Sequence, residues 1–328
     1  MLGWLRRRKD PVPVTKLLFA TDLHGSTACL RKVVAAAKRH EVDYVILGGD
    51  LTGKAMVPVI REGNGRYHAY LFGSRHEAET KEGLAKLTDL IASVGHYSHV
   101  CNAAEARELE SDPARLDAVF AEKMRERLIA WLEYLEAGLA PAGIGCYIIA
   151  GNDDVRELDT ILNASPFVVN VDGKVVPLGD HHELVGLGDS VITPWACPRD
   201  VDEDTLARRI DKLMAEVQCP ERAVLNFHCP PYNTKLDQVP KLNERLEIEH
   251  EGGQVVMTSA GSKAVREAIE RYQPVLSLHG HVHEGRGVHR LGRTVAINPG
   301  SEYAEGILRS ALINLEPDRV KGYLLLSG

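Results

Sequence analysis

Short apolar runs alternate with amphipathic stretches along most of the chain, and several of these runs end in polar residues. Residues 16–21 form an apolar run typical of a buried strand, and residues 26–40 follow with apolar side chains at helical spacing. A second apolar run, at 42–47, completes a strand–helix–strand pattern. This pattern predicts parallel strands joined by a right-handed crossover.

Residues 52–143 interrupt the alternation. Two β-prone runs around Gly63–Asn64–Gly65 predict a hairpin, and residues 77–94 and 113–137 have the periodicity of amphipathic helices. An insert between two strands that carry candidate site residues is well placed to act as a cap. It is equally well placed to be the surface of a homo-oligomer.

The alternation resumes after the insert. Further strands are predicted at 146–150, 182–186, 223–227 and 275–278, and helices at 155–162, 203–216 and 262–272. A hairpin turning at Asp172–Gly173 is predicted within 168–178, and the tail is predicted to pair strands 294–298, 311–315 and 320–326. The pattern as a whole predicts two sheets with helices outside them.

Residues that can bind metal ions follow five of the predicted strands. They are Asp22, His24, Asp50, Asn152, His228, His281 and His283. Delivery of such side chains to the ends of successive strands predicts one site at one sheet edge. Two carboxylates, one amide and four imidazoles suit borderline ions such as Mn²⁺, Fe²⁺, Zn²⁺ or Co²⁺ better than Mg²⁺ or Ca²⁺.

Some of these residues also have a purely structural interpretation. Asp22 alone would be interpreted as a helix N-cap and Asn152 as the cap of a turn. His281 and His283 alternate at strand spacing, so we expect both to face the same side. The loop at Tyr232, Thr234 and Lys235 suits phosphate binding and a structural role equally. Agreement of five elements in order favours metal binding over separate structural roles.

Composition and charge narrow the class of substrate and the cellular location that we expect. A net charge of −7 disfavours general electrostatic binding of nucleic acid. It favours a small or modest-sized substrate. Six cysteines without a CxxC pair indicate reduced thiols. No apolar run approaches the roughly 20 residues that span a bilayer. The start, MLGWLRRRKD, lacks the apolar stretch of a signal peptide, so we expect a cytoplasmic protein without a membrane partner.

The five elements resemble the motifs of the calcineurin-like metallophosphoesterase family, in particular prokaryotic members of unassigned substrate. The family pattern stands here as Asp22-Leu23-His24, Gly49-Asp50, Gly151-Asn152-Asp153-Asp154, His228 and Gly280-His281-Val282-His283. With the NPGS loop at 298–301, the resemblance spans residues 16–301. It implies a four-layer α/β/β/α sandwich of two mixed sheets flanked by helices. The expected organisation is a single domain over 1–328 with an inserted hairpin-helical cap at about 52–143.

The resemblance also implies roles for the site residues. Asp22, His24, Asp50 and His283 would hold a first metal, and Asp50 would bridge to a second held with Asn152, His228 and His281. Two divalent transition-metal ions are expected, Mn²⁺ foremost, with Fe, Zn, Co or Ni as alternatives. A metal-bridging hydroxide would then attack the phosphorus of a phosphomonoester or phosphodiester. Catalytic roles fall to Asp153, Asp50 and His24, and substrate contacts to Asn152, Asp153, Tyr232 and Ser301.

One position departs from the family pattern. Most members carry histidine after the GN pair, where this chain has Asp153. A carboxylate beside a phosphate repels it unless the carboxylate is protonated. One hypothesis is therefore that Asp153, or the adjacent Asp154, acts as the general acid, and another is that a good leaving group needs no acid.

Two further functions stay open alongside phosphoester hydrolysis. A nuclease is one, although the acidic balance of the chain gives it no support. The other is a non-catalytic scaffold that has kept the fold for protein binding. The complete set of metal ligands argues against a scaffold.

Overall fold

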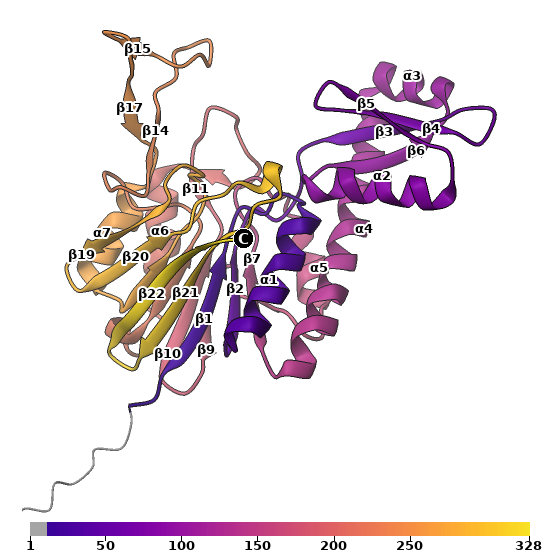
Figure 1. The fold of residues 1–328 in the computed structure, drawn as a ribbon. Coiled ribbons are helices and arrows are strands. Elements are labelled where there is room, and N and C mark those ends of the chain that lie inside the picture. Colours follow the sequence, from indigo (N-terminus) through magenta and orange to yellow (C-terminus); the bar gives the residue numbers. More distant parts are fainter. Residues whose placement is uncertain (1–11) are drawn as a thin grey trace, which may run out of the picture.

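Two six-stranded mixed sheets form the body of the molecule in the computed structural model, which describes residues 12–328 (Figure 1). The basic segment at 1–10, from which we expect no signal peptide, lies outside the described residues. The first sheet has the strand order β22-β21-β1-β2-β7-β8, and the second has the order β19-β20-β18-β13-β10-β9. Each sheet contains both parallel and antiparallel pairs.

The first sheet confirms the predicted strand–helix–strand unit. Its strands are β1 (Thr15–Ala20), β2 (Tyr44–Gly48), β7 (Gly145–Ile149), β8 (Val169–Asn170), β21 (Arg309–Glu316) and β22 (Arg319–Ser327). Helix α1 (Thr27–His40) connects the parallel strands β1 and β2, and Ser26 caps it by accepting a hydrogen bond from the Cys29 amide. Helices α4 (Pro113–Leu139) and α5 (Leu158–Ala164) share one hydrophobic cluster with α1 and this sheet.

The second sheet carries its own pair of helices. Its strands are β9 (Lys174–Leu178), β10 (His182–Leu187), β13 (Val224–Phe227), β18 (Leu276–Leu278), β19 (Gly287–Leu291) and β20 (Thr294–Asn298). Helices α6 (Glu203–Met214) and α7 (Lys263–Tyr272) pack on it through another cluster, which includes Ile210 and Ile269. These helices confirm the predicted amphipathic segments.

The two sheets share a cluster of fully buried aliphatic and aromatic side chains. Phe19 and Ile46 contribute to it from the first sheet, and Leu184, Val224 and Leu276 from the second. Burial of each such side chain stabilises the fold by about 1.5–3 kcal/mol. This cluster therefore fixes one sheet against the other, and with it the strand ends of both.

Two predicted pairings are wrong. The strands within 168–178 do not form a hairpin, because β8 pairs with β7 in the first sheet and β9 pairs with β10 in the second. The turn at Asp172–Gly173 carries the chain from one sheet to the other. The tail strands also separate, since β20 joins the second sheet while β21 and β22 join the first. Apolar alternation identifies a strand but does not say which sheet receives it.

The insert contains a small sheet of its own with the order β5-β4-β3-β6. Its elements are β3 (Met56–Arg61), β4 (Tyr67–Leu71), β5 (Ser74–Ala78), α2 (Lys81–Ser93), β6 (Tyr97–Cys101) and α3 (Ala103–Ser111). The antiparallel pair β3–β4 confirms the predicted hairpin, whereas β5, β6 and α3 were not expected. Figure 1 shows this unit standing beside the sheets, with α4 running from it along α1.

Several short elements complete the structure. An arm projects from the body at the end opposite the insert (Figure 1), built from β14 (Gln238–Pro240), β15 (His250–Glu251), β16 (Gln254–Val255) and β17 (Met257–Ser259). The others are β11 (Ser190–Val191), β12 (Asp200–Val201) and three 3-10 turns, η1 (Ala140–Ala142), η2 (Pro220–Arg222) and η3 (Tyr303–Glu305). Along residues 12–328, no helix has both the length and the apolar character needed to cross a membrane.

Candidate metal centre

The seven predicted ligands come together in one cluster. They lie in the loops that follow β1, β2, β7, β13 and β18, three strands of the first sheet and two of the second. Within each sheet these strands run parallel to one another, so their carboxyl ends meet at one edge. The packing of the two sheets brings both edges together.

One part of the cluster contains Asp22, His24 and His283. The Nε2 atoms of His24 and His283 lie 3.1 Å apart, and Asp22 Oδ1 lies 3.6 Å from His283 Nε2. His24 and Asp22 are fully buried. Their three ligating atoms lie within 4.8 Å of one another, which is a spacing that one metal ion can occupy.

The other part contains Asn152, His228 and His281. Asn152 Oδ1 lies 3.1 Å from His228 Nε2 and 2.9 Å from His281 Nδ1. The Asn152 amide nitrogen donates to Asp200, which turns the amide oxygen toward the two imidazoles. His228 Nδ1 lies 2.8 Å from the Gly48 carbonyl, so Nδ1 donates there and Nε2 faces the Asn152 oxygen.

Asp50 lies between the two parts. Its Oδ2 is 3.6 Å from His24 Nε2, and its Oδ1 is 3.4 Å from His228 Nε2. Each carboxylate oxygen therefore faces a different imidazole. This is the geometry that a bridging carboxylate requires.

The backbone at these ligands is unusual. Asp22, His24, Asp50 and His281 all have positive φ angles, between 39° and 66°. Few residues other than glycine adopt this conformation, and it costs free energy that the surrounding structure must offset. Its concentration at four of the seven ligands indicates a functional site.

The glycines of the motifs allow the ligand loops to approach closely. A Cβ atom at Gly151 would overlap the Asp50 carboxylate, and one at Gly280 would lie 2.5 Å from Asp22 Oδ2. Only glycine leaves the space that these carboxylates occupy. The GN and GH pairs are thus explained by the packing of one ligand loop on another.

Charge inside the cluster is balanced between carboxylates and imidazoles. Burial by itself raises the pKa of Asp50, but His228 outweighs burial and holds the pKa well below its usual range. Burial lowers the pKa of His228, yet Asp50 outweighs it and raises that pKa to about 10. Burial lowers the pKa of both His24 and His281 to about 4. These two imidazoles are neutral at pH 7, the form that binds metal ions.

The donor chemistry fits divalent cations. Two ionised carboxylates are buried here, and buried charge is stable only when it is paired. The neutral imidazoles and the Asn152 oxygen complete a set of nitrogen and oxygen ligands around them. The residues therefore fit two closely spaced metal ions, with Asp50 between them.

The ligands His281 and His283 reach the cluster by a different route from the one predicted. Strand β18 ends at Leu278, and His281 has a φ of 66°, so the two histidines do not share a face of a strand. The strand-parity expectation was wrong, because the chain leaves the sheet before the ligands. His279 is a buried packing residue, with Nδ1 2.9 Å from the Phe227 carbonyl.

The two aspartates proposed as general acids have different surroundings. Asp154 is fully buried and accepts hydrogen bonds from the Leu51 and Thr52 amides and the Thr52 hydroxyl. It anchors the loop that follows Asp50 and does not face the cluster. Asp153 does face it, with a carboxylate oxygen within 4.8 Å of ligating atoms of His24 and Asp50. The acid role of Asp153 stays a prediction.

The other expected substrate contacts are engaged with protein groups. The Ser301 hydroxyl donates to the Asp22 carbonyl at 2.7 Å, and the Ser301 amide donates to the His283 carbonyl. Ser301 thus ties two ligand loops together. Tyr232 lies against α7, where its carbonyl accepts from Arg266 and its ring lies under the Lys263 ammonium.

Sequence reasoning missed several neighbours of the cluster. Lys54 forms an ion pair with Asp153, and Cys197 Sγ donates to the same carboxylate at 2.9 Å. The centroid of the Tyr303 ring lies 4.6 Å from that of the His24 ring. Ser190 Oγ lies 3.2 Å from His281 Nε2. Only Lys54 had a sequence signal, because it lies four residues after Asp50 in the same loop.

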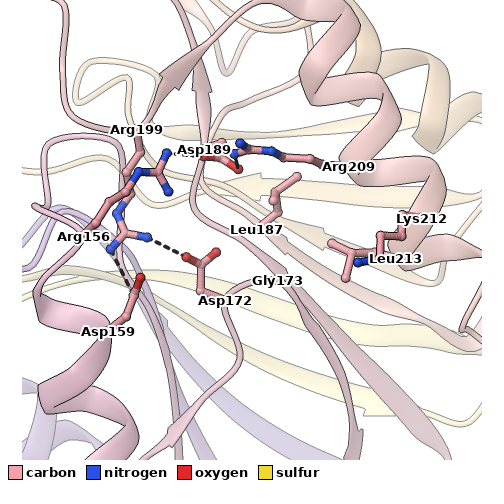
Figure 2. A pocket seen from close by; sticks show the side chains of 10 residues that line it. All are labelled: Arg156, Asp159, Asp172, Gly173, Leu187, Asp189, Arg199, Arg209, Lys212 and Leu213. Carbon is pink, nitrogen blue, oxygen red and sulfur yellow. Dashed lines mark hydrogen bonds and ion pairs between the residues drawn. The ribbon is translucent and has the colours of Figure 1, made fainter.

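A buried arginine supports the Asn152 loop from behind. Arg199 is 1% exposed, its amide donates to the Asn152 carbonyl, and its Nε donates to the Asp154 carbonyl. Its guanidinium also pairs with Asp159 at 3.0 Å and Asp172 at 2.8 Å (Figure 2). These groups line a cavity of about 250 Å³ that is separate from the seven ligands. Arg199 therefore positions the loop and does not reach a substrate at the metal centre.

Comparison with known proteins gives one relative by sequence. The uncharacterized protein MJ1162 of Methanocaldococcus jannaschii is 30% identical over 176 residues, which cover 53% of this chain and 68% of that protein. No family model matches the chain. Among solved structures, TT1561 of Thermus thermophilus shares the fold with a TM-score of 0.51 at 15% identity, covering 93% of this chain and 100% of that one.

The sequence relationship and the site geometry each establish one point about the chain. The identity to MJ1162 over two thirds of that protein establishes a common family. The DxH, GD, GND, H and GHVH motifs converge on one cluster of carboxylates and imidazoles. The chain therefore belongs to one family with MJ1162, and the five motifs that resemble those of the calcineurin-like metallophosphoesterases gather at its candidate metal centre.

Proposed function

We propose that the protein hydrolyses a phosphoester at a dinuclear metal centre. The observation that carries the proposal is the position of Asp50, whose two carboxylate oxygens face the separate imidazoles of His24 and His228. Asp22, His24, Asp50 and His283 would hold one ion, and Asp50, Asn152, His228 and His281 the other. When bound, the ions would supply Lewis acidity toward water and toward the phosphate oxygens.

The chain's own residues prepare this centre. The Gly48 carbonyl fixes the tautomer of His228, and Asp200 fixes the orientation of Asn152, so that donor atoms point inward. Asp154 and Ser301 hold the ligand loops by hydrogen bonds to their backbone. Burial of the ligands excludes bulk water from the metal side of the site. The ligands are therefore oriented before a substrate arrives.

Finer features belong to the same proposal. Mn²⁺ is the foremost candidate ion, and the substrate is a phosphomonoester or phosphodiester of small or modest size. The fold would be a four-layer α/β/β/α sandwich, which the cluster between the sheets and the cluster under each set of helices support. The insert at 52–143 would act as a cap within a single domain, or as a homo-oligomer surface.

Metal content and turnover test the proposal together. We expect about two transition-metal ions per chain by mass spectrometry, and hydrolysis of bis-p-nitrophenyl phosphate or p-nitrophenyl phosphate with at least one of Mn²⁺, Fe²⁺, Zn²⁺, Co²⁺ and Ni²⁺. Asp50→Asn should lower turnover by about 100-fold or more and lose metal, because an amide cannot bridge two ions as a carboxylate does. Asparagine also tolerates the positive φ of Asp50, so the backbone need not change.

A matched control variant separates the effect of losing the Asp50 carboxylate at the site from the effect of losing a carboxylate elsewhere. Asp117→Asn on the exposed side of α4 should leave metal content and turnover unchanged. A wild-type protein that binds no transition metal and turns over neither ester would instead support the non-catalytic scaffold.

A further inference from the structure

Asp153 places a negative charge beside the metal centre. Its carboxylate lies within 4.8 Å of ligating atoms of His24 and Asp50, and its amide donates to Asp50 Oδ1 at 3.0 Å. An anionic substrate that reaches the centre therefore meets a third carboxylate in addition to Asp22 and Asp50. A cation beside Asp153 would offset its repulsion of a phosphate.

Lys54 is that cation. Its ammonium pairs with Asp153 Oδ2, while Cys197 Sγ donates to Asp153 Oδ1, so the carboxylate is held between them. The Lys54 side chain is 52% exposed, whereas the metal-ligating carboxylates beneath it are buried. The Lys54 ammonium is therefore accessible to an anion in solvent.

The backbone that carries Lys54 is clamped between the body and the insert. The Gly53 amide donates to the Tyr97 hydroxyl at 2.8 Å, and a Cβ at Gly53 would overlap the Gly95 carbonyl of the insert. Arg127 of α4 donates to the carbonyls of Gly25 and His96, which joins the His24 loop to the same contact. Contacts with the insert thus hold the loop after Asp50 in place. The backbone position of Lys54 beside the site is therefore fixed.

The Lys54–Asp153 ion pair contributes little to the stability of the fold. Partly exposed Lys–Asp pairs contribute little to folding, because water and salt screen them. For the same reason Lys54 can exchange Asp153 for another anion at small cost. A phosphate oxygen offers the ammonium a charge-assisted hydrogen bond of at least equal strength.

We propose that Lys54 binds a non-bridging oxygen of the substrate phosphate, and that it exchanges its ion pair with Asp153 for this contact. This inference rests on the proposed phosphoesterase function. The Asp153 carboxylate, which would otherwise repel phosphate, becomes half of a neutral pair in the resting site.

Binding of inorganic phosphate to the Mn²⁺-loaded protein tests the inference without reliance on turnover. Lys54→Met keeps the length of the side chain and removes its charge. We expect it to weaken phosphate binding about 10- to 100-fold by isothermal titration calorimetry, while the metal content stays at the wild-type value. Lys54→Arg should restore binding to within about threefold of wild type, because a cation is present again.

Two further variants make the result specific. Lys81→Met, at the exposed start of α2 in the insert, is the matched control and should leave phosphate affinity unchanged. Asp153→Asn should leave phosphate binding as tight as in wild type or tighter, because it removes a repelling charge and frees Lys54.

The outcomes that overturn the inference differ from failure of the proposed function. Phosphate affinity of Lys54→Met within twofold of wild type, with metal bound, excludes Lys54 as the phosphate contact. Weak binding by Lys54→Met and Lys54→Arg alike would show that charge is not what matters. A wild-type protein that binds metal but neither binds phosphate nor hydrolyses the two nitrophenyl esters overturns both proposals.

Discussion

At the scale of single residues, the metal centre depends on backbone positions that most side chains cannot occupy. Four ligands have positive φ angles, and the glycines before Asn152 and His281 leave space for the carboxylates of Asp50 and Asp22. Free energy stored in such conformations is offset by the packing of the sheets beneath. The motif glycines are therefore as necessary for the site as the ligands themselves.

Substitution of one motif glycine tests this dependence. Gly151→Ala adds a Cβ that overlaps the Asp50 carboxylate, so we expect at least tenfold weaker metal binding and a loss of about 1–3 kcal/mol in the free energy of unfolding. Calorimetric metal titration and urea unfolding measure the two effects. Gly63→Ala, where a Cβ meets no atom within 4 Å, should change neither. Metal affinity of Gly151→Ala equal to wild type would contradict the close approach.

At the scale of elements, Arg199 and its carboxylate partners connect the Asn152 loop to the turn after β8. Asp172 is nearly buried there, accepts from the Gly188 amide at 2.7 Å and pairs with Arg199. Burial outweighs the pairing with Arg199 and raises the pKa of Asp172 to about 6. The loop behind the metal centre thus carries a group that changes protonation near pH 6.

The sign of the resulting pH dependence follows from linkage. Because the pKa of Asp172 is higher in the folded protein than its ordinary value of 3.8, its contribution to stability is complete below about pH 3.8 and is lost as the pH rises through about 6. Asp172→Asn lacks this dependence. Between pH 4 and pH 7, wild type should therefore lose about 1–3 kcal/mol of stability relative to Asp172→Asn.

Urea unfolding of both proteins across this pH range measures the difference. Asp180→Asn, at an exposed turn, should follow wild type at every pH. A constant difference between wild type and Asp172→Asn from pH 4 to pH 7 would show that Asp172 does not titrate as expected.

At the scale of the whole molecule, stability and site geometry come from the same interface. The cluster between the sheets brings three strand ends of one sheet against two of the other, and α4 extends the core of the first sheet to the insert. Most cysteines are enclosed by this packing, with Cys29, Cys101, Cys146 and Cys229 buried and Cys219 exposed. The thiols therefore report how intact the packing is.

Thiol labelling makes this measurable. Because the thiolate is the reactive form, and burial raises the pKa of Cys146 to about 12 and of Cys229 to about 11, we expect one fast-reacting thiol with a disulfide reagent at pH 8. Cys219→Ser should abolish the fast phase, and all six thiols of the wild-type chain should react in concentrated urea. Two or more fast thiols in the Cys219→Ser protein would indicate that the packing opens under native conditions.

The sequence was sufficient for the local elements and for the residues that gather at the candidate metal centre. The strand–helix–strand unit, the insert hairpin and the order of the seven ligands follow from periodicity and from polar residues at strand ends, which depend on neighbouring residues alone. The same information could not assign β8 and β9 to different sheets, or place β20 apart from β21. Those choices depend on which apolar faces meet across the core.

What the sequence by itself determined is the donor set: which carboxylates, imidazoles and amide the chain delivers to the ends of its strands. The tertiary structure alone decided how that set is surrounded. It turned His281 away from strand geometry, committed the Ser301 hydroxyl to the Asp22 carbonyl and brought Lys54 and Cys197 to Asp153. The physical reason is that a ligand type is a property of one residue. A hydrogen-bond partner or an ion pair depends on two segments that only the packed sheets and the insert bring within reach.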